Sequence, residues 1–333
     1  MAGSTGSSRP GARIATAITE RFGLRHPILL APMGDTAGGR LAAAVSRGGG
    51  LGMVGGGYAD AAWLERELGE AGGERVGVGF ITFALAEQPE ALDVALDARP
   101  VAVQLAFGDP RPFADRILAS GAALLCCAQT DEEVEAALAA GADVIVAQGR
   151  DAGGHGRPDR GTMGLVPSVV DRAGGVPVVA AGGIVDARGV AAAIALGAAG
   201  VSMGTRFVTT PESISTAKER AGLVAARGQD TIRTEAVDHI RGPAWPDGHD
   251  GRIVRNRLVE RFERLGGDAE ATERLREELR ASAPDDYSLR PLWGGEGLDL
   301  VGDVRPAAEL VEQIGTDAAR RLLRSAGQVT ELG

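Results

Sequence analysis

The chain has 333 residues, with 35 basic and 45 acidic side chains, a formal net charge of −10 and 44% hydrophobic residues. This length suits one large barrel with an appended domain, or two domains. The acidic balance argues against a general nucleic-acid binder, which needs a basic surface. No apolar run approaches the roughly 20 residues that span a membrane, so we expect no membrane partner.

The N-terminal segment is expected to form a flexible tail over residues 1–20. Its first ten residues are rich in glycine and serine, and no apolar segment follows them, unlike in a signal peptide.

Two adjacent cysteines, Cys126 and Cys127, are the only ones in the chain. In a strand they point to opposite faces, so we expect buried free thiols and no disulfide between them. The default setting for such a protein is the reducing cytoplasm.

The first two hundred residues repeat one plan, in which a short apolar run, a glycine or polar turn and an Ala-rich helical stretch follow one another. Apolar strands of this length that alternate with helices indicate βα units and a parallel sheet. The predicted strands are 26–31, 51–54, 76–80, 101–105, 122–128, 144–148, 176–180 and 200–203, and the predicted helices are 40–47, 61–68, 89–96, 112–119, 131–140, 168–173 and 187–196.

Eight such units predict an α/β fold of the (β/α)₈ TIM-barrel class. An open doubly wound sheet is the alternative, and the barrel is favoured because the units continue without a gap to eight. The barrel is expected over residues 21–211 and 288–333, where 307–325 reads as a terminal helix that closes it.

A small, mainly helical cap domain is expected after strand eight, over residues 212–287. The segment is rich in charge, and no alternation of strands and helices is visible in it. Its predicted helices are 213–227, 252–265 and 270–280. A peripheral decoration or a homodimer face are the alternatives to a cap over the barrel mouth.

Two glycine turns predict a phosphate-binding site, because barrel enzymes commonly build one from the loops after strands seven and eight. Gly182 and Gly183 precede the helix 187–196, and Gly204 and Thr205 follow strand eight. Glycines let backbone N–H groups approach phosphate oxygens, and a helix start adds further donors. Ordinary tight βα turns are the alternative.

His155 is the main candidate for chemistry, because it follows strand six in a glycine-rich loop on the side where barrel active sites lie. Its imidazole can donate, accept or take a proton near neutral pH. A solvent-exposed loop histidine is the alternative. Gln148 closes strand six and would bind the polar edge of a ring or bond a neighbouring loop. Asp151 would pair with an arginine.

The remaining histidines do not predict a metal site. His26 begins strand one, at the opposite end of the barrel, and is expected to be structural. His239 and His249 lie in the cap without cysteine or carboxylate partners at metal spacing. Trp245, in the cap loop, would line a pocket or anchor the loop.

Six segments together resemble the nitronate monooxygenases, formerly called 2-nitropropane dioxygenases, and the resemblance covers about residues 21–323. The segments are HPILLAPMG at 26–34, GLGMV at 50–54, VAQGRDAGGH at 146–155, VVAAGGI at 178–184, GVSMGTRF at 200–207 and WGGEG at 293–297.

The resemblance implies FMN, an eight-stranded barrel and a cap inserted after strand eight. It implies that Met33, Gln148 and Gly153 contact the flavin, and that His155 is the active-site histidine. The cofactor-binding residues toward the phosphate end would be Gly183, Ser202, Met203, Gly204 and Thr205.

The implied reaction is oxidation of a small-molecule nitronate by O₂ to a carbonyl compound and nitrite. His155 would remove an α-proton from a neutral nitroalkane or orient a nitronate. Two departures affect the substrate: Gly79 stands where relatives often have asparagine, and Asp151 where they often have glutamate. An NAD(P)H-dependent FMN reductase, of the enoyl-acyl-carrier-protein reductase or quinone reductase type, is the second hypothesis. A non-catalytic flavin-binding protein is the third.

Overall fold

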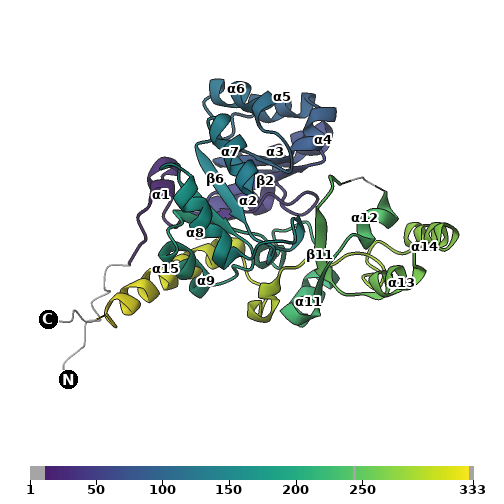
Figure 1. Cartoon of the computed structure of the whole chain (residues 1–333). Coiled ribbons are helices and arrows are strands. Elements are labelled where there is room, and N and C mark those ends of the chain that lie inside the picture. Colours follow the sequence, from purple (N-terminus) through teal and green to yellow (C-terminus); the bar gives the residue numbers. More distant parts are fainter. Residues whose placement is uncertain (1–11, 243–244, 330–333) are drawn as a thin grey trace.

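The eight predicted strands form a closed parallel barrel in a computed structural model that describes residues 12–242 and 245–329 (Figure 1). The strand order is β1-β9-β8-β6-β5-β4-β3-β2. Leu51, just before β2, pairs with Leu29 of β1, and the Leu30 N–H donates to the Leu51 carbonyl at 2.9 Å. The barrel strands are β1 (Ile28–Leu30), β2 (Gly52–Gly57), β3 (Val76–Ile81), β4 (Ala102–Ala106), β5 (Ala123–Ala128), β6 (Val144–Gln148), β8 (Val178–Ala181) and β9 (Gly200–Met203). The closed ring confirms the TIM barrel over the open sheet.

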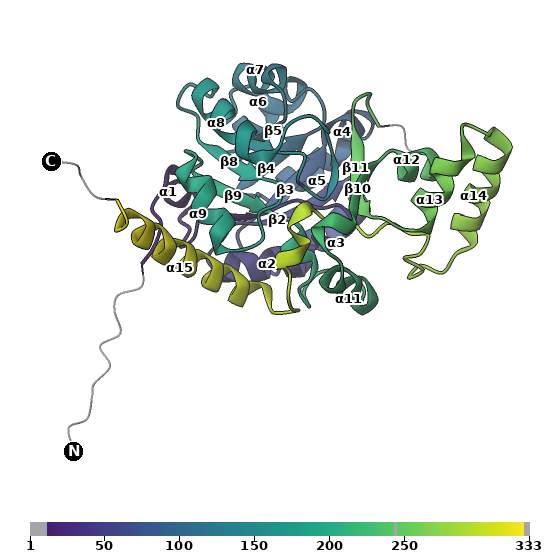
Figure 2. The ribbon, with the colours of Figure 1, turned by 60° about the horizontal axis from the view of Figure 1, so that its bottom comes forward.

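A ring of helices covers the outside of the barrel, so that the strands are buried on both faces (Figure 2). Apolar strands therefore need no alternation of polar residues. The predicted helix 168–173 begins earlier, at Thr162, and contains Pro167. The ring helices between the strands are α2 (Gly39–Arg47), α3 (Ala61–Glu70), α4 (Thr82–Glu87), α5 (Glu90–Asp97), α6 (Arg111–Ala119), α7 (Asp131–Ala139), α8 (Thr162–Arg172) and α9 (Ala187–Ala195).

Helices near both ends of the described chain complete the barrel. α15 (Ala307–Ala326), the predicted terminal helix, packs against both α9 and α2, the last and first helices of the ring. The prediction of a flexible tail is wrong for residues 12–20, because α1 (Ala17–Phe22) is capped by Thr16 and buries Ile18 in the barrel core. Residues 1–11 lie outside the described part. No helix in residues 12–242 or 245–329 has the length and apolarity to cross a membrane.

The cap protrudes from one side of the barrel and contains strands as well as helices (Figure 1). The predicted helix 252–265 is wrong in its first part, because Asp250–Val254 forms β11 and the helix α13 starts only at Arg257. β11 lies between two antiparallel partners, β10 (Thr231–Thr234) and β7 (Gly154–Gly156). The cap-region helices are α11 (Ala217–Ala225), α12 (Ala236–Arg241), α13 (Arg257–Leu265) and α14 (Ala269–Ala281).

The cap has a hydrophobic core separate from the barrel core. Ile253 of β11 and Leu258 of α13 are fully buried in it, together with Leu275 of α14. The strand at 250–254 was missed because its pairing partners lie about 20 residues away in β10 and about 95 residues away in β7. Residues so distant leave no local periodicity, whereas the charged pattern of α13 is local.

Candidate active site

His155 lies on the barrel side where the strands end, on a short strand that belongs to the cap sheet. β7 follows β6 in the chain, and His155 pairs in register with Gly251 of β11. Arg233 of β10 fixes the same loop, since its guanidinium donates to the Gly156 carbonyl at 2.6 Å and to the Arg150 carbonyl at 3.0 Å. The His155 side chain is only 12% exposed. His155 is therefore a largely buried residue on a strand fixed by backbone pairing, and not a solvent-exposed loop histidine.

Three side chains surround the imidazole of His155. Trp245 stacks on it with ring centroids 3.7 Å apart and planes 4° apart. Trp293 lies at a centroid distance of 4.9 Å and a tilt of 42°. The two carboxylate oxygens of Asp238 lie 2.9 and 3.0 Å from Nε2. One ring face is thus covered by Trp245 and the Nε2 edge by Asp238, with Trp293 close by, and all three residues are distant from His155 in the sequence.

Aromatic residues from three barrel loops pack edge-on around Trp245. Tyr58 follows β2, Phe83 lies in α4 after β3, and Phe107 follows β4, with centroid distances to the Trp245 ring of 6.4, 5.1 and 5.1 Å. The Trp245 indole N–H also donates to the Tyr58 hydroxyl at 3.0 Å. Burial raises the pKa of Tyr58. Trp245 therefore anchors the cap loop to the barrel and lines the space beside His155.

Gln148 holds the histidine strand through its side chain. The side-chain amide nitrogen of Gln148 donates to the His155 backbone carbonyl at 2.8 Å. The backbone carbonyl of Gln148 accepts from the side-chain amide of Gln129 at 3.0 Å. The Cys127 thiol lies 3.5 Å from its amide oxygen. This is the loop-bonding interpretation of Gln148, and Gln129 is a partner that sequence reasoning missed.

The predicted glycine turns lie close together around residues 293–297. Thr205 accepts the Gly295 N–H at 3.1 Å, so its own hydroxyl proton remains free to donate. A Cβ on Gly153 would lie 2.7 Å from the Gly294 carbonyl carbon, so only glycine fits that approach. Gly183 has φ +66°. Neither the Gly183 nor the Gly204 N–H takes part in a turn, loop or cap hydrogen bond with another described backbone group.

The start of α9 does not offer its amides as the sequence suggested. Asp186 caps this helix, and its carboxylate accepts the N–H groups of Arg188 at 2.8 Å and Gly189 at 3.4 Å. A negative side chain already occupies the positive end of the helix dipole. The prediction that this helix start directs free N–H groups at a phosphate is therefore wrong, and the donors that remain are the two turns and Thr205.

The other predicted cofactor residues lie on β9 and after β1. A Cβ on Gly204 would lie 3.2 Å from the Met33 sulfur, so these two residues are neighbours. Ser202 is buried on β9. Met203 is fully buried in the barrel core, and its carbonyl accepts the Ala31 N–H at 2.9 Å. The Met203 side chain therefore lies in the barrel core and supports the turn at Gly204 through packing.

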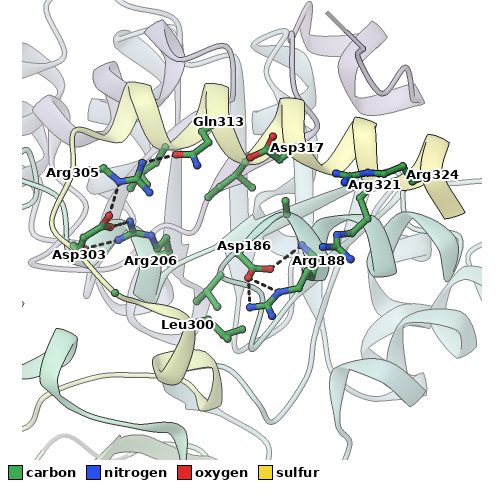
Figure 3. A pocket seen from close by; sticks show the side chains of 15 residues that line it. Asp186, Arg188, Arg206, Leu300, Asp303, Arg305, Gln313, Asp317, Arg321 and Arg324 are labelled. Carbon is green, nitrogen blue, oxygen red and sulfur yellow. Dashed lines mark hydrogen bonds and ion pairs between the residues drawn. The ribbon is translucent and has the colours of Figure 1, made fainter.

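A surface pocket of about 640 Å³ lies behind these turns, between α9 and α15 (Figure 3). Three of its five arginines, Arg188, Arg206 and Arg305, pair with aspartates within the pocket. Arg206 is 4% exposed and pairs with Asp303 at 2.5 Å, and Arg188 pairs with Asp186 at 2.6 Å. His155 does not line this pocket. The Arg206–Asp303 pair fastens the connection before α15 to the barrel, whereas Arg188–Asp186 is a local pair at the start of α9.

Of the other three histidines, only His249 lies beside the aromatic residues around Trp245. His26 is buried at the opposite end of β1, with Nε2 3.2 Å from Glu312, which fits its predicted structural role. His239 lies exposed on α12 near Glu235. His249 is buried edge-on to Phe107, and burial lowers its pKa.

Asp151 and the cysteines have structural contacts. Asp151 accepts the Thr162 N–H at 2.7 Å at the start of α8, instead of forming the expected pair with an arginine. Cys126 and Cys127 are free thiols as predicted, the first buried and the second half-buried. Burial raises the pKa of Cys126 to about 12, which makes it unreactive near neutral pH.

The barrel mouth has features that fit a polar ring system such as a flavin. The Thr82 hydroxyl oxygen and the Gln104 amide oxygen are buried without a hydrogen-bond partner in the described chain. Gln104 is in register with Gly79 on the next strand. A Cβ on Gly79 of β3 would lie 2.3 Å from Pro32, which follows β1, two strands away in the ring, so these positions face the interior. Pro32 thus excludes an asparagine at position 79, and Gln104 offers an amide beside it.

The model of the family described as nitronate monooxygenase matches residues 78–317. The chain belongs to this family. A nitronate monooxygenase of Pseudomonas aeruginosa is 34% identical over 360 residues, which cover 89% of this chain and 98% of the relative.

Solved structures agree with the assignment to the nitronate monooxygenase family. FabK from Thermotoga maritima superposes with a TM-score of 0.83 and 30% identity, over 95% of this chain and 100% of that chain. A nitroalkane oxidase from Streptomyces ansochromogenes gives a TM-score of 0.75 and 30% identity, over 92% and 100%. This nitronate monooxygenase family member is a flavin-dependent oxidoreductase, as its sequence predicted.

Proposed function

We propose that the protein oxidises alkyl nitronates with O₂, using FMN, to a carbonyl compound and nitrite. The observation that carries the proposal is the placement of one held histidine and two open glycine turns at the same end of a barrel of this family. His155 is fixed by Asp238 and Trp245, and Gly183 and Gly204 lie where a phosphate would be bound. This is the arrangement that a flavin barrel needs for its cofactor and its substrate.

The residues present would hold FMN at both of its ends. Gly183, Gly204 and Thr205 would bind the phosphate with backbone N–H groups and a hydroxyl. Met33 and Gly153 would lie against the cofactor, and Gln104 would present its side-chain amide to the ring system. Bound there, FMN would supply two-electron redox chemistry between the nitronate and O₂.

The chain's own residues would bind the substrate and move its proton. His155 would take the α-proton of a neutral nitroalkane, or orient a nitronate that is already anionic. Trp245, Tyr58, Phe83 and Phe107 form an aromatic wall beside it, which suits an alkyl substituent. The nitro oxygens need donors, and the Tyr58 hydroxyl, which accepts the Trp245 N–H, keeps its own proton to donate to one of them.

Anaerobic bleaching of the flavin tests the proposal. The FMN-loaded protein is mixed without oxygen with propionate 3-nitronate in one cuvette and with NADH or NADPH in another. Bleaching by the nitronate alone, reversed by air, is expected. A His155→Gln variant should keep its flavin and lose turnover of neutral nitroalkanes, whereas full turnover in that variant would move the chemistry elsewhere.

An NAD(P)H-dependent reductase is the second candidate, because FabK superposes on this chain with a higher TM-score than the nitroalkane oxidase does. Bleaching by NAD(P)H alone in the same experiment would favour it, and enoyl thioesters and quinones would then be tried as acceptors. Either activity suits a reducing cytoplasmic setting, in keeping with the two free thiols.

A further inference from the structure

Three consecutive parts of the cap contact β7, the short strand that carries His155. Asp238 of α12 reaches Nε2, Trp245 of the following loop stacks on the ring, and Gly251 of β11 pairs with the backbone. The imidazole therefore cannot rotate without breaking both a stack and a hydrogen bond. The cap thus determines that Nε2 of His155 faces Asp238.

The pair of Asp238 and His155 is shielded from water. Both side chains are 12% exposed. A carboxylate so little exposed is costly unless it accepts hydrogen bonds. Its oxygens lie 2.9 and 3.0 Å from the same nitrogen, and no other side chain in the described chain donates to them. A proton on Nε2 satisfies this carboxylate, whereas a lone pair on Nε2 would repel it.

We propose that Asp238 is a positioning residue that holds His155 in the tautomer with its proton on Nε2, so that Nδ1 is the base. Nδ1 forms no hydrogen bond with a described residue and is not fully buried, so its lone pair can accept a proton. The inference rests on the proposed function for its substrate. In the step, the α-proton of a neutral nitroalkane moves to Nδ1. The C–H electron pair becomes the C=N bond of the nitronate, the N=O π pair moves onto a nitro oxygen as its negative charge, and the carboxylate of Asp238 stabilises the imidazolium formed.

Histidine ¹⁵N NMR tests the tautomer without any activity. The chain has four histidines, so the signals of ¹⁵N-histidine-labelled, FMN-loaded protein can be assigned with His155→Gln. Above neutral pH the wild type should show His155 protonated on Nε2, and Asp238→Ala should shift it toward a mixture of tautomers. A wild-type His155 protonated on Nδ1, or an unchanged tautomer in Asp238→Ala, would overturn the proposal.

Kinetics provide the second readout, through the difference between a neutral substrate and its anion. Asp238→Ala and the isosteric Asp238→Asn should slow flavin reduction by neutral nitroethane about 100-fold or more, the lower end of general-base contributions. Reduction by ethyl nitronate, which needs no proton removal, should fall less than about tenfold, and KM should change little. Equal losses with both substrates would contradict a role through the base.

Glu235, the residue just before α12, offers a matched control, because it pairs with exposed His239 at 3.4 Å. Glu235→Ala should leave the His155 tautomer and both rates unchanged. Flavin content and melting temperature show whether the Asp238→Ala variant is folded. If it is not, Asp238→Asn replaces it in the test, because asparagine has the same shape as aspartate. If the wild type oxidises neither substrate, the proposed function fails, while the NMR result still decides whether Asp238 positions His155.

Discussion

Replacement of Gly183 by aspartate should empty the flavin site. The substitution places a carboxylate in the turn where we expect the FMN phosphate. Two unit charges about 4 Å apart repel by about 4 kcal/mol at an effective dielectric constant of about 20. That energy corresponds to a roughly 10³-fold weaker dissociation constant for FMN.

The backbone contributes a smaller and separable cost at this position. Gly183 has φ +66°, and a Cβ there would lie 3.2 Å from the Asp151 Cβ. A side chain in the left-handed region costs about 1–2 kcal/mol. Gly183→Ala has this strain without the charge, so it should lower the melting temperature by a few degrees and weaken FMN binding far less than the aspartate does.

Gly175→Asp is the matched control for charge, because Gly175 has φ +95° and open space around its Cβ, in the turn before β8 at the other end of the barrel. All three variants are stripped of flavin and titrated with FMN, with protein fluorescence as the signal. Gly175→Asp should bind FMN like the wild type. Equal affinities of Gly183→Asp and Gly183→Ala would refute the phosphate assignment.

Three further substitutions test other parts of the site. Trp245→Ala should raise KM for the nitronate and lower the melting temperature, with flavin content kept, since it removes the His155 stack and the Tyr58 hydrogen bond; an unchanged KM would mean that Trp245 does not line the substrate space. Gln104→Leu should leave the apoprotein as stable or stabilise it by about 1 kcal/mol, because the Gln104 amide oxygen is buried without a partner, while FMN affinity falls about tenfold; unchanged affinity in a fluorescence titration would remove Gln104 from the flavin site. Burial holds the pKa of His249 below its usual value, so the unfolded chain takes up the proton first and stability is lost as pH falls below about 6.5. His249→Phe should therefore lose less melting temperature than the wild type between about pH 7.5 and pH 5.5, and an equal loss would show that His249 does not contribute to acid sensitivity.

The sequence by itself determined the barrel fold and the end of the barrel at which the candidate active site lies. Apolar runs of strand length, each followed by a turn and a helix, are local signals, and eight parallel strands of this kind have few ways to bury both faces. The glycine turns at Gly183 and Gly204, and His155 after strand six, follow from position along the chain alone. The barrel brings the ends of consecutive strands to one face, so chain order predicts which loops meet.

Only the tertiary structure decided what surrounds His155. Asp238 is 83 residues away in the sequence, and β11 pairs with β7 across a similar separation. An acidic residue on a charged helix gives no local sign of such a partner. Contacts of this kind depend on where the cap packs, and packing between distant segments is a property of the folded chain, not of any stretch of it.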